Sequence, residues 1–330
     1  MIIMNYIGSK RRLSSFLLET ITDTVGTLDD KIFCDIFAGT GIVGRTFKSK
    51  VKKVISNDLE YYSYVLNRNY IQNHKPIAYE EILERLNALE GKKGFIYNHY
   101  CMQSGSGRNY FSAHNAMKID AIREAIEVYR KDEDLYFFLL ASLLESLDKV
   151  SNTASVYGSF LKHLKPTAQV PLQLEPALFE CNENRHEVFH EDSNTLIKKI
   201  SGDILYLDPP YNGRQYGANY HLLNTIATYN TNFHPKGKTG TNPSYNRSMY
   251  CKTKRVHSTL EELIKEADFQ YIFLSYNNEG MVPQKDIQNI MKRYGKYDLI
   301  STSYKRFKAD SNRPHKATRT EEHLHILQKY

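Results

Sequence analysis

The stretch that decides the fold is Asp203-Ile204-Leu205-Tyr206-Leu207-Asp208-Pro209-Pro210-Tyr211. Its first half is mostly apolar, which is typical of a short buried strand. The two prolines then end the strand, because neither can donate a backbone hydrogen bond to a neighbouring strand. Asp208 is therefore expected at the carboxyl end of a sheet strand, the edge where open α/β sheets bind ligands. A carboxylate, constrained carbonyls and a ring at this edge favour a clamp for a flat, amine-bearing molecule, although a simple proline-rich turn fits these letters equally well.

A glycine-rich turn lies upstream of this clamp. Residues 31–37 are expected to form a buried strand that continues into Asp35-Ile36-Phe37-Ala38-Gly39-Thr40-Gly41 and a helix from Ile42. Such a turn brings a cofactor against backbone N–H groups, and the absence of both phosphate-binding fingerprints favours a cofactor with little phosphate. Asp58 follows the next strand about twenty positions later, where an acid binds a ribose diol. Asp58 could equally cap the following helix.

The rest of the chain predicts an α/β domain with an insertion. After about residue 185, strands and helices alternate again, and the last two strands have no helix between them, which predicts an antiparallel hairpin. We therefore expect a mostly parallel sheet with an antiparallel final strand in a catalytic domain of residues 1–75 and 185–330. Between them, residues 76–184 show helical periodicity, and we expect a largely helical insertion with exposed, basic loops. A long polar loop is expected at residues 230–258.

Composition limits the partners of the protein. The chain has 330 residues, 41% of them hydrophobic, a formal charge of +7 and 25 tyrosines, which favours a polyanion such as nucleic acid. The four cysteines have no metal or redox spacing, so we expect reduced thiols in a cytoplasmic protein. No segment has the length of a signal peptide or a membrane span. His99, His114 and His163 lack ligand spacing, so no metal site is expected.

Three motifs occur in order: Tyr6-Ile7-Gly8-Ser9-Lys10, Phe37-Ala38-Gly39-Thr40-Gly41 and Asp208-Pro209-Pro210-Tyr211. In this order the chain resembles the S-adenosylmethionine-dependent DNA adenine methyltransferases of the Dam-like group. The resemblance covers the sheet core and matches the insertion in position and character only. It implies a Rossmann-like class I methyltransferase sheet, methylation of the N6 amine of a flipped adenine in double-stranded DNA, and an insertion that recognises the target. It also implies a restriction-modification system, for which a cognate restriction endonuclease is a candidate partner, although the sequence does not show whether one accompanies the protein.

The resemblance further implies a role for each matching residue. The target adenine would be held by Asp208, Pro209, Pro210 and Tyr211. The methionine end of S-adenosylmethionine would be lined by Tyr6, Gly8 and Lys10, and its cradle by Asp35, Phe37, Ala38, Gly39 and Gly41. Asp58 would bind the ribose hydroxyls, Leu59 would contact the cofactor's adenine, and Asp192 its exocyclic amine or ring. The candidates for phosphate contacts are the basic loop residues Arg108, Lys162, Lys165, Arg247, Lys252, Lys254, Arg255, Lys305, Arg306, Lys308, Arg313 and Lys316.

The chemistry of the clamp agrees with these roles. Hydrogen bonds from the adenine amine to Asp208 and to the Pro209 carbonyl would free the nitrogen lone pair to attack the sulfonium methyl group, with no covalent enzyme intermediate. The clamp recognises a planar amine, so adenine in RNA and the N4 amine of cytosine remain alternatives. A catalytically silent nucleic-acid-binding subunit is a further alternative. Such a subunit should have lost Asp208 or the glycine turn, and both are intact.

Overall fold

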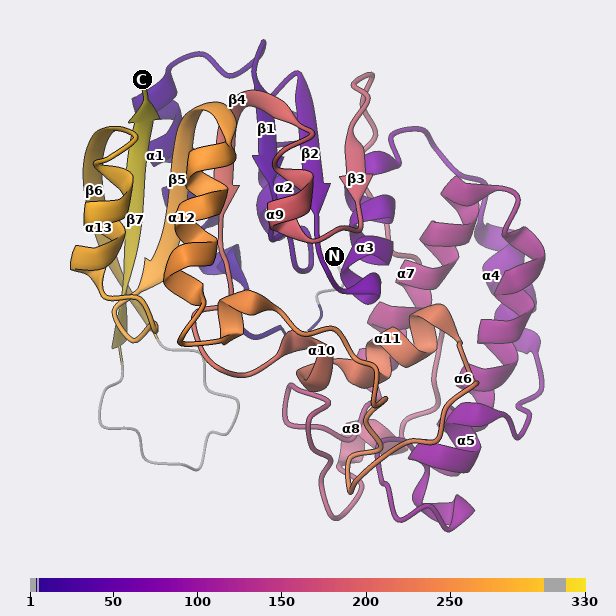
Figure 1. Cartoon of the computed structure of the whole chain (residues 1–330). Coiled ribbons are helices and arrows are strands. Elements are labelled where there is room, and N and C mark those ends of the chain that lie inside the picture. Colours follow the sequence, from indigo (N-terminus) through magenta and orange to yellow (C-terminus); the bar gives the residue numbers. More distant parts are fainter. Residues whose placement is uncertain (1–3, 5, 306–318) are drawn as a thin grey trace. The chain divides into compact units, whose positions relative to one another are not determined.

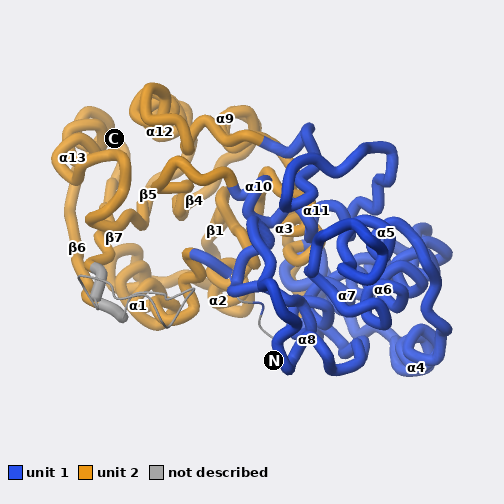
Figure 2. The backbone as a smooth tube through the Cα atoms, turned by 90° about the horizontal axis from the view of Figure 1, so that it is seen from below, with its two compact units in different colours: residues 1–7, 68–181, 216–246 blue, residues 8–67, 182–215, 247–330 orange. Residues whose placement is uncertain are grey.

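The computed structural model describes residue 4 and residues 6–305 and 319–330. The chain divides into two compact units, coloured separately in Figure 2. The sheet unit contains residues 8–67, 182–215 and 247–330, and the helical unit contains residues 1–7, 68–181 and 216–246. Residues 216–246, which the sequence assigns to the catalytic domain, belong to the helical unit by their contacts.

One sheet organises the sheet unit. In the described part of the chain it has seven strands in the order β3-β2-β1-β4-β5-β7-β6. The first five are mutually parallel, whereas β7 is antiparallel to both of its neighbours, β5 and β6. This confirms the expected Rossmann-like α/β sheet with its antiparallel final strand. The strands are β1 (Ile32–Asp35), β2 (Lys53–Asn57), β3 (Glu187–Phe189), β4 (Ser201–Leu207), β5 (Asp268–Asn277), β6 (Gly295–Lys305) and β7 (Arg319–Lys329).

Helices cover both faces of this sheet (Figure 1). Alternate residues of β4 point to opposite faces. Leu205 and Leu207 pack in one apolar cluster with α9, α12 and α13, while Tyr206 stacks on Phe33, which stacks on Phe47 of α2. The central strand is thus buried on both sides, as its apolar sequence predicts. The helices of this unit are α1 (Ser14–Val25), α2 (Ile42–Phe47), α3 (Tyr61–Asn67), α9 (Ser193–Leu196), α12 (Val256–Glu266) and α13 (Gln284–Met291), with short 3₁₀ turns at Lys10–Leu13 and Met249–Cys251.

The helical unit is built around α7 (Glu133–Lys149), whose residues from Leu135 to Leu147 are all buried. Asp132 begins this helix by accepting a hydrogen bond from the Leu135 N–H at 3.2 Å. The insertion is therefore helical, as its periodicity predicts. The short helix α5 lies within residues 91–114, where one of the exposed loops is expected. The other described helices are a π-helical turn at Arg68–Gln72, α4 (Glu80–Ala88), α5 (Phe95–Tyr100), α6 (Ala113–Ile126), α8 (Pro166–Gln169), α10 (Tyr216–Asn219) and α11 (His221–Thr228), with 3₁₀ turns at Met102–Ser104 and Glu127–Tyr129.

Candidate active site

The Asp208–Tyr211 clamp follows β4 directly. The Asp208 side chain is 17% exposed, Pro209 is buried and Tyr211 is half-buried. The Tyr211 ring meets Tyr276 edge to face, with 6.2 Å between centroids, and the Tyr211 carbonyl accepts a hydrogen bond from the Met281 N–H at 3.0 Å. Because both the backbone and the ring of Tyr211 are held, the turn presents Asp208 on a fixed support.

Lys10 is an ion-pair partner of Asp208. Its ammonium nitrogen is 3.0 Å from Asp208 Oδ1 and 2.9 Å from Glu322 Oε1, and the two partners are 17% and 1% exposed. The Ser275 hydroxyl donates a further hydrogen bond to Glu322. In the structure the ammonium of Lys10, a residue expected at the methionine end of the cofactor, contacts these two carboxylates. A buried ammonium requires such anionic partners.

Burial and charge set the protonation of this cluster. Burial raises the pKa of Asp208 to about 6, while Lys10 acts to lower this pKa and Glu322 to raise it. Burial alone would lower the pKa of Lys10, but the two carboxylates hold that pKa well above its usual value. The Lys10 ammonium lies 3.0 Å from Asp208 Oδ1, and this contact opposes the rise in the pKa of Asp208. The Asp208 carboxyl therefore changes its protonation state close to neutral pH.

The glycine turn between β1 and α2 is braced by Asp58 and Asn67. The Asp58 carboxylate accepts hydrogen bonds from the N–H groups of Gly39 at 2.8 Å and Glu60 at 2.9 Å. Gly41 has φ +75°, and a Cβ atom there would lie 2.7 Å from Asn67 Oδ1. Glycine is therefore required here for both conformation and space. Burial raises the pKa of Asp58 to about 6, with the bound N–H groups opposing that rise.

Asp35 ends β1 beneath this turn. Its side chain is 1% exposed, and among the described residues its Oδ1 has no hydrogen-bond partner. Burial, together with the charges of Asp208 and Asp58, raises the pKa of Asp35. A buried, unsatisfied acceptor normally has an explanation in a missing donor. Asp35 Oδ1 is therefore available as a hydrogen-bond acceptor next to the turn.

The other expected cofactor residues are held in different ways. Phe37 meets Tyr250 edge to face at 4.9 Å, and the Leu59 carbonyl lies 3.0 Å from His190 Nε2. Asp192 caps α9 by accepting hydrogen bonds from the N–H groups of Asn194 at 3.0 Å and Thr195 at 3.1 Å, a structural role that sequence reasoning missed. Gly8 has φ +79° and Ala38 is buried. Tyr6 belongs to the helical unit, where it stacks on Tyr220 at 4.9 Å.

The expected DNA-contacting residues fall into three groups. The Arg108 guanidinium donates to the carbonyls of His99, Pro235 and Gly237, and the Lys165 ammonium donates to the Thr153 carbonyl at 3.0 Å, so both side chains have internal partners. The exposed group consists of Lys162, Arg247, Lys252, Lys254 and Arg255. The side chain of Lys305 and the residues Arg306, Lys308, Arg313 and Lys316 lie outside the described part of the structure.

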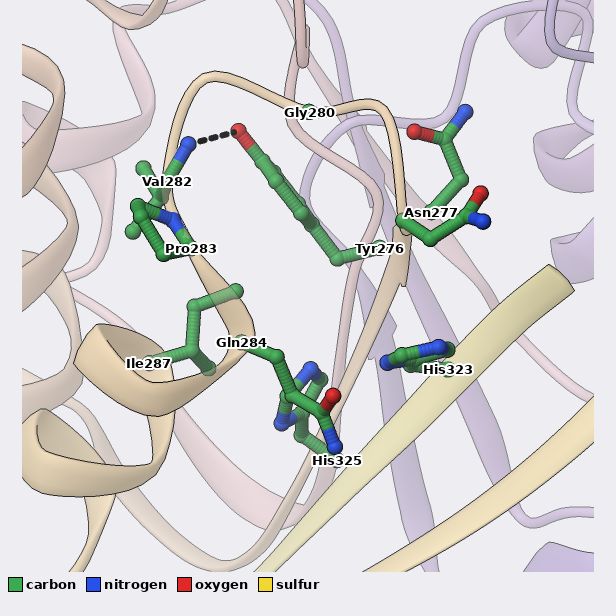
Figure 3. A pocket seen from close by; sticks show the side chains of 10 residues that line it. Tyr276, Asn277, Gly280, Val282, Pro283, Gln284, Ile287, His323 and His325 are labelled. Atoms are coloured by element: carbon green, nitrogen blue, oxygen red, sulfur yellow. Dashed lines mark hydrogen bonds between the residues drawn. The ribbon is translucent and has the colours of Figure 1, made fainter.

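A small cavity of about 110 Å³ lies where β5, β7 and α13 meet (Figure 3). The Tyr276 hydroxyl crosses it to accept a hydrogen bond from the Val282 N–H at 3.3 Å, and His323 and His325 line it from β7. Since neighbouring strand residues point to opposite faces, these histidines and Glu322 lie on opposite faces of the sheet. Burial and His323 lower the pKa of His325 to about 3, so this ring is neutral at physiological pH. Sequence reasoning missed this cavity.

Three further features of the described residues concern metal ligation, the cysteines and membrane spanning. No group of three or more histidine, cysteine, aspartate or glutamate side chains among them is arranged to hold a metal ion. All four cysteines are free thiols, three of them buried. Within the described chain, every helix is too short or too polar to cross a membrane.

Comparison with known proteins assigns the family. A family model described as D12 class N6 adenine-specific DNA methyltransferase matches residues 6–290. The chain belongs to this family. It is 60% identical to the Type II methyltransferase M.NlaIII of Neisseria lactamica, over 99% of both chains. It is 38% identical to M.CviAII of Paramecium bursaria Chlorella virus 1, over 93% of both. It is 37% identical to M.FokI of Planomicrobium okeanokoites, over 99% of this chain and 53% of that one.

Family membership places the site in a chemical context. The protein is an adenine-specific DNA methyltransferase, as the ordered motifs predicted. This finding favours adenine in DNA over the alternatives of RNA and of cytosine N4. It also agrees with the intact Asp208 clamp and glycine turn, which a catalytically silent subunit should have lost.

Proposed function

We propose that the protein transfers the methyl group of S-adenosylmethionine to the N6 amine of an adenine that has left the stack of double-stranded DNA. The observation that carries the proposal is the Asp208 carboxylate, partly exposed at the carboxyl end of β4, beside the Tyr211 ring and backed by Lys10. Ligands of open α/β sheets bind at this edge. The amine would donate to Asp208 and to the Pro209 carbonyl, and Tyr211 would stack on the base.

The residues around the glycine turn fit S-adenosylmethionine. When bound, this cofactor supplies an electrophilic sulfonium methyl group. The unsatisfied Asp35 Oδ1 is a suitable acceptor for the amino group of its methionine part. Gly39 and Gly41 leave the backbone of the turn without side chains, and Asp58 stands where the ribose hydroxyls can donate to it. Phe37, Ala38, Leu59, Asp192 and Gly8 complete the proposed lining.

The roles of Tyr6 and Lys10 differ from the rest of the set. Tyr6 supports the helical unit through its stack on Tyr220. Its contact with the methionine end of the cofactor is part of the proposal. Lys10 serves the clamp by pairing with Asp208. The positive charge of Lys10 stabilises the ionised carboxylate, which is the stronger acceptor for a hydrogen bond from the amine.

The pH dependence of methylation should report the protonation of Asp208. Because the pKa of Asp208 is raised to about 6 and the ionised carboxylate is the form proposed to activate the amine, kcat/KM for DNA should fall tenfold per pH unit below about pH 6. The measurement is the initial rate of labelled methyl transfer between pH 5 and pH 8.5. Saturating cofactor removes the contribution of Asp58, whose pKa is also about 6. A profile that stays flat down to pH 5 would contradict this role of Asp208.

The DNA is proposed to bind exposed basic residues, namely Lys162, Arg247, Lys252, Lys254 and Arg255, through its phosphates. The helical unit is proposed to read the target sequence. The relatives M.NlaIII, M.CviAII and M.FokI are named Type II methyltransferases. We therefore infer that this protein marks one short site in a restriction-modification system and that a restriction endonuclease accompanies it.

Mapping modified adenines in the genome of a host that expresses the protein tests this proposal. Modification should be confined to one short sequence context and should disappear in cells that express the Asp208→Ala variant. DNA from expressing cells should also resist cleavage by an endonuclease specific for the mapped site. Modified adenines scattered without a common sequence would contradict site-specific methylation.

A further inference from the structure

Three segments far apart in the sequence meet at the Lys10 ammonium. Lys10 comes from the 3₁₀ turn before α1, Asp208 follows β4, and Glu322 lies on β7. The Lys10 and Glu322 side chains are only 4% and 1% exposed. Nothing in the proposed reaction accounts for a second carboxylate here, since Lys10 and Asp208 alone would form a complete ion pair.

The second carboxylate changes the charge balance of the clamp. Among the described residues, one ammonium faces two carboxylates, so these three side chains, when fully ionised, carry a net negative charge. Glu322 is engaged by two donors, Lys10 and the Ser275 hydroxyl. Asp208, which is the more exposed carboxylate, therefore shares Lys10 and keeps part of its capacity to accept hydrogen bonds.

We propose that Glu322 is a positioning residue that holds the Lys10 ammonium between two carboxylates, so that Lys10 supports Asp208 without neutralising it. The inference rests on the proposed function of the clamp. Glu322 acts through Lys10 and touches neither the base nor the cofactor. With Glu322 present, Asp208 remains an acceptor strong enough to bind the adenine amine and to take its proton after the methyl group has been transferred.

The effects of the neighbouring charges on Asp208 have opposite signs. Glu322 raises the pKa of Asp208, and Lys10 lowers it. In the part of the chain that the structure describes, the other titratable groups that face the cluster are Tyr206 of β4, Tyr211 of the clamp and Asp35 of β1. The side-chain hydroxyls of both tyrosines stay protonated near neutral pH, because burial raises the pKa of each. Substitutions of Glu322 and Lys10 should thus shift the acid limb of the rate profile in opposite directions.

The experiment compares Glu322→Gln with Lys10→Met in the full-length protein. The readout is kcat/KM for duplex DNA between pH 5 and pH 8.5, with saturating cofactor. Glu322→Gln should move the acid limb to lower pH by on the order of one unit, and Lys10→Met should move it to higher pH. In Glu322→Gln the plateau rate should also fall, by up to about tenfold, because a weaker base accepts the amine less well. Loss of structure alone would lower both plateaus without opposite shifts.

The matched control is Glu321→Gln. Glu321 is the neighbouring residue on β7, its side chain is 53% exposed, and the same charge is removed. This variant should keep the wild-type profile. Glu322→Asp provides a second test if Glu322→Gln folds poorly, because the shorter side chain keeps the charge but moves it away from Lys10. The acid limb of its rate profile should move to lower pH, by less than in Glu322→Gln.

The proposal is overturned if the profiles of Glu322→Gln and Glu322→Asp coincide with those of wild type and Glu321→Gln. It is equally overturned if Glu322→Gln and Lys10→Met shift the limb in the same direction. Failure of the proposed function would look different, because the wild-type protein itself would then transfer no methyl group to DNA.

Discussion

Asp208→Ala is expected to reduce kcat for methyl transfer by at least about 10³-fold while leaving cofactor affinity within a factor of a few. The carboxylate is the group that would bind the amine and draw its nitrogen lone pair toward the methyl group. The substitution removes this interaction. Lys10 keeps its ion pair with Glu322, so we expect its ammonium to stay buried. The turn should persist, because Pro209 is buried and the Met281 N–H holds the Tyr211 carbonyl.

Single-turnover rates and calorimetric titration with S-adenosylmethionine measure the two effects separately. Asp268→Ala is the matched control, since Asp268 is the first residue of the adjacent strand β5 and is exposed at the opposite end of the sheet. This control should retain the wild-type rate. Asp208→Asn, which keeps the size of the side chain, should be nearly as inactive as Asp208→Ala. A rate for Asp208→Ala close to that of Asp268→Ala would remove the clamp from the mechanism.

Asp58→Ala is expected to weaken S-adenosylmethionine binding by roughly 100-fold, which is the loss expected for charged hydrogen bonds to two hydroxyls. Asp58 also holds the N–H groups of Gly39 and Glu60, so the variant loses both a ligand contact and a brace of the turn. Affinity of the wild-type protein should decline as the pH falls below about 6, because the Asp58 carboxyl then becomes protonated.

A cofactor analogue that lacks the ribose 2′-hydroxyl separates the contact from the brace. The wild-type protein should bind the analogue more weakly than the cofactor, whereas Asp58→Ala should bind the two nearly equally. Asp30→Ala is the control, because Asp30 precedes β1 and its side chain is 72% exposed. If Asp58→Ala discriminates between the two ligands as well as the wild type does, Asp58 does not bind the ribose.

The sequence predicted the elements whose signal is local. Proline ends β4 after Leu207, glycine opens the turn before α2, and strand-length apolar runs predict the strands themselves, although not their order in the sheet. The clamp at Asp208 and the brace at Asp58 follow from these signals, because each lies next to the strand that positions it. Element ends were less well predicted: α12 begins at Val256, inside the expected polar loop.

Contacts that depend on tertiary packing were not predictable from local sequence signals. Glu322 meets Lys10 only because β7 pairs with β5 in one register, opposite Asn277. No local pattern in the sequence specifies this register. Likewise, residues 216–246 join the helical unit through long-range contacts such as the hydrogen bonds from Arg123 to the Ile226 and Ala227 carbonyls at 2.8 and 2.9 Å. Periodicity identifies the helix α11 but not the unit in which it packs.

The most direct test of the central claim is the identity of the methylated nucleoside. Purified protein is incubated with duplex DNA and S-adenosylmethionine that carries a trideuterated methyl group, and the DNA is digested to nucleosides for mass spectrometry. The account predicts the label in N6-methyldeoxyadenosine, and no label when Asp208→Ala replaces the wild type. Label in N4-methyldeoxycytidine, or in RNA but not in DNA under the same conditions, would contradict it.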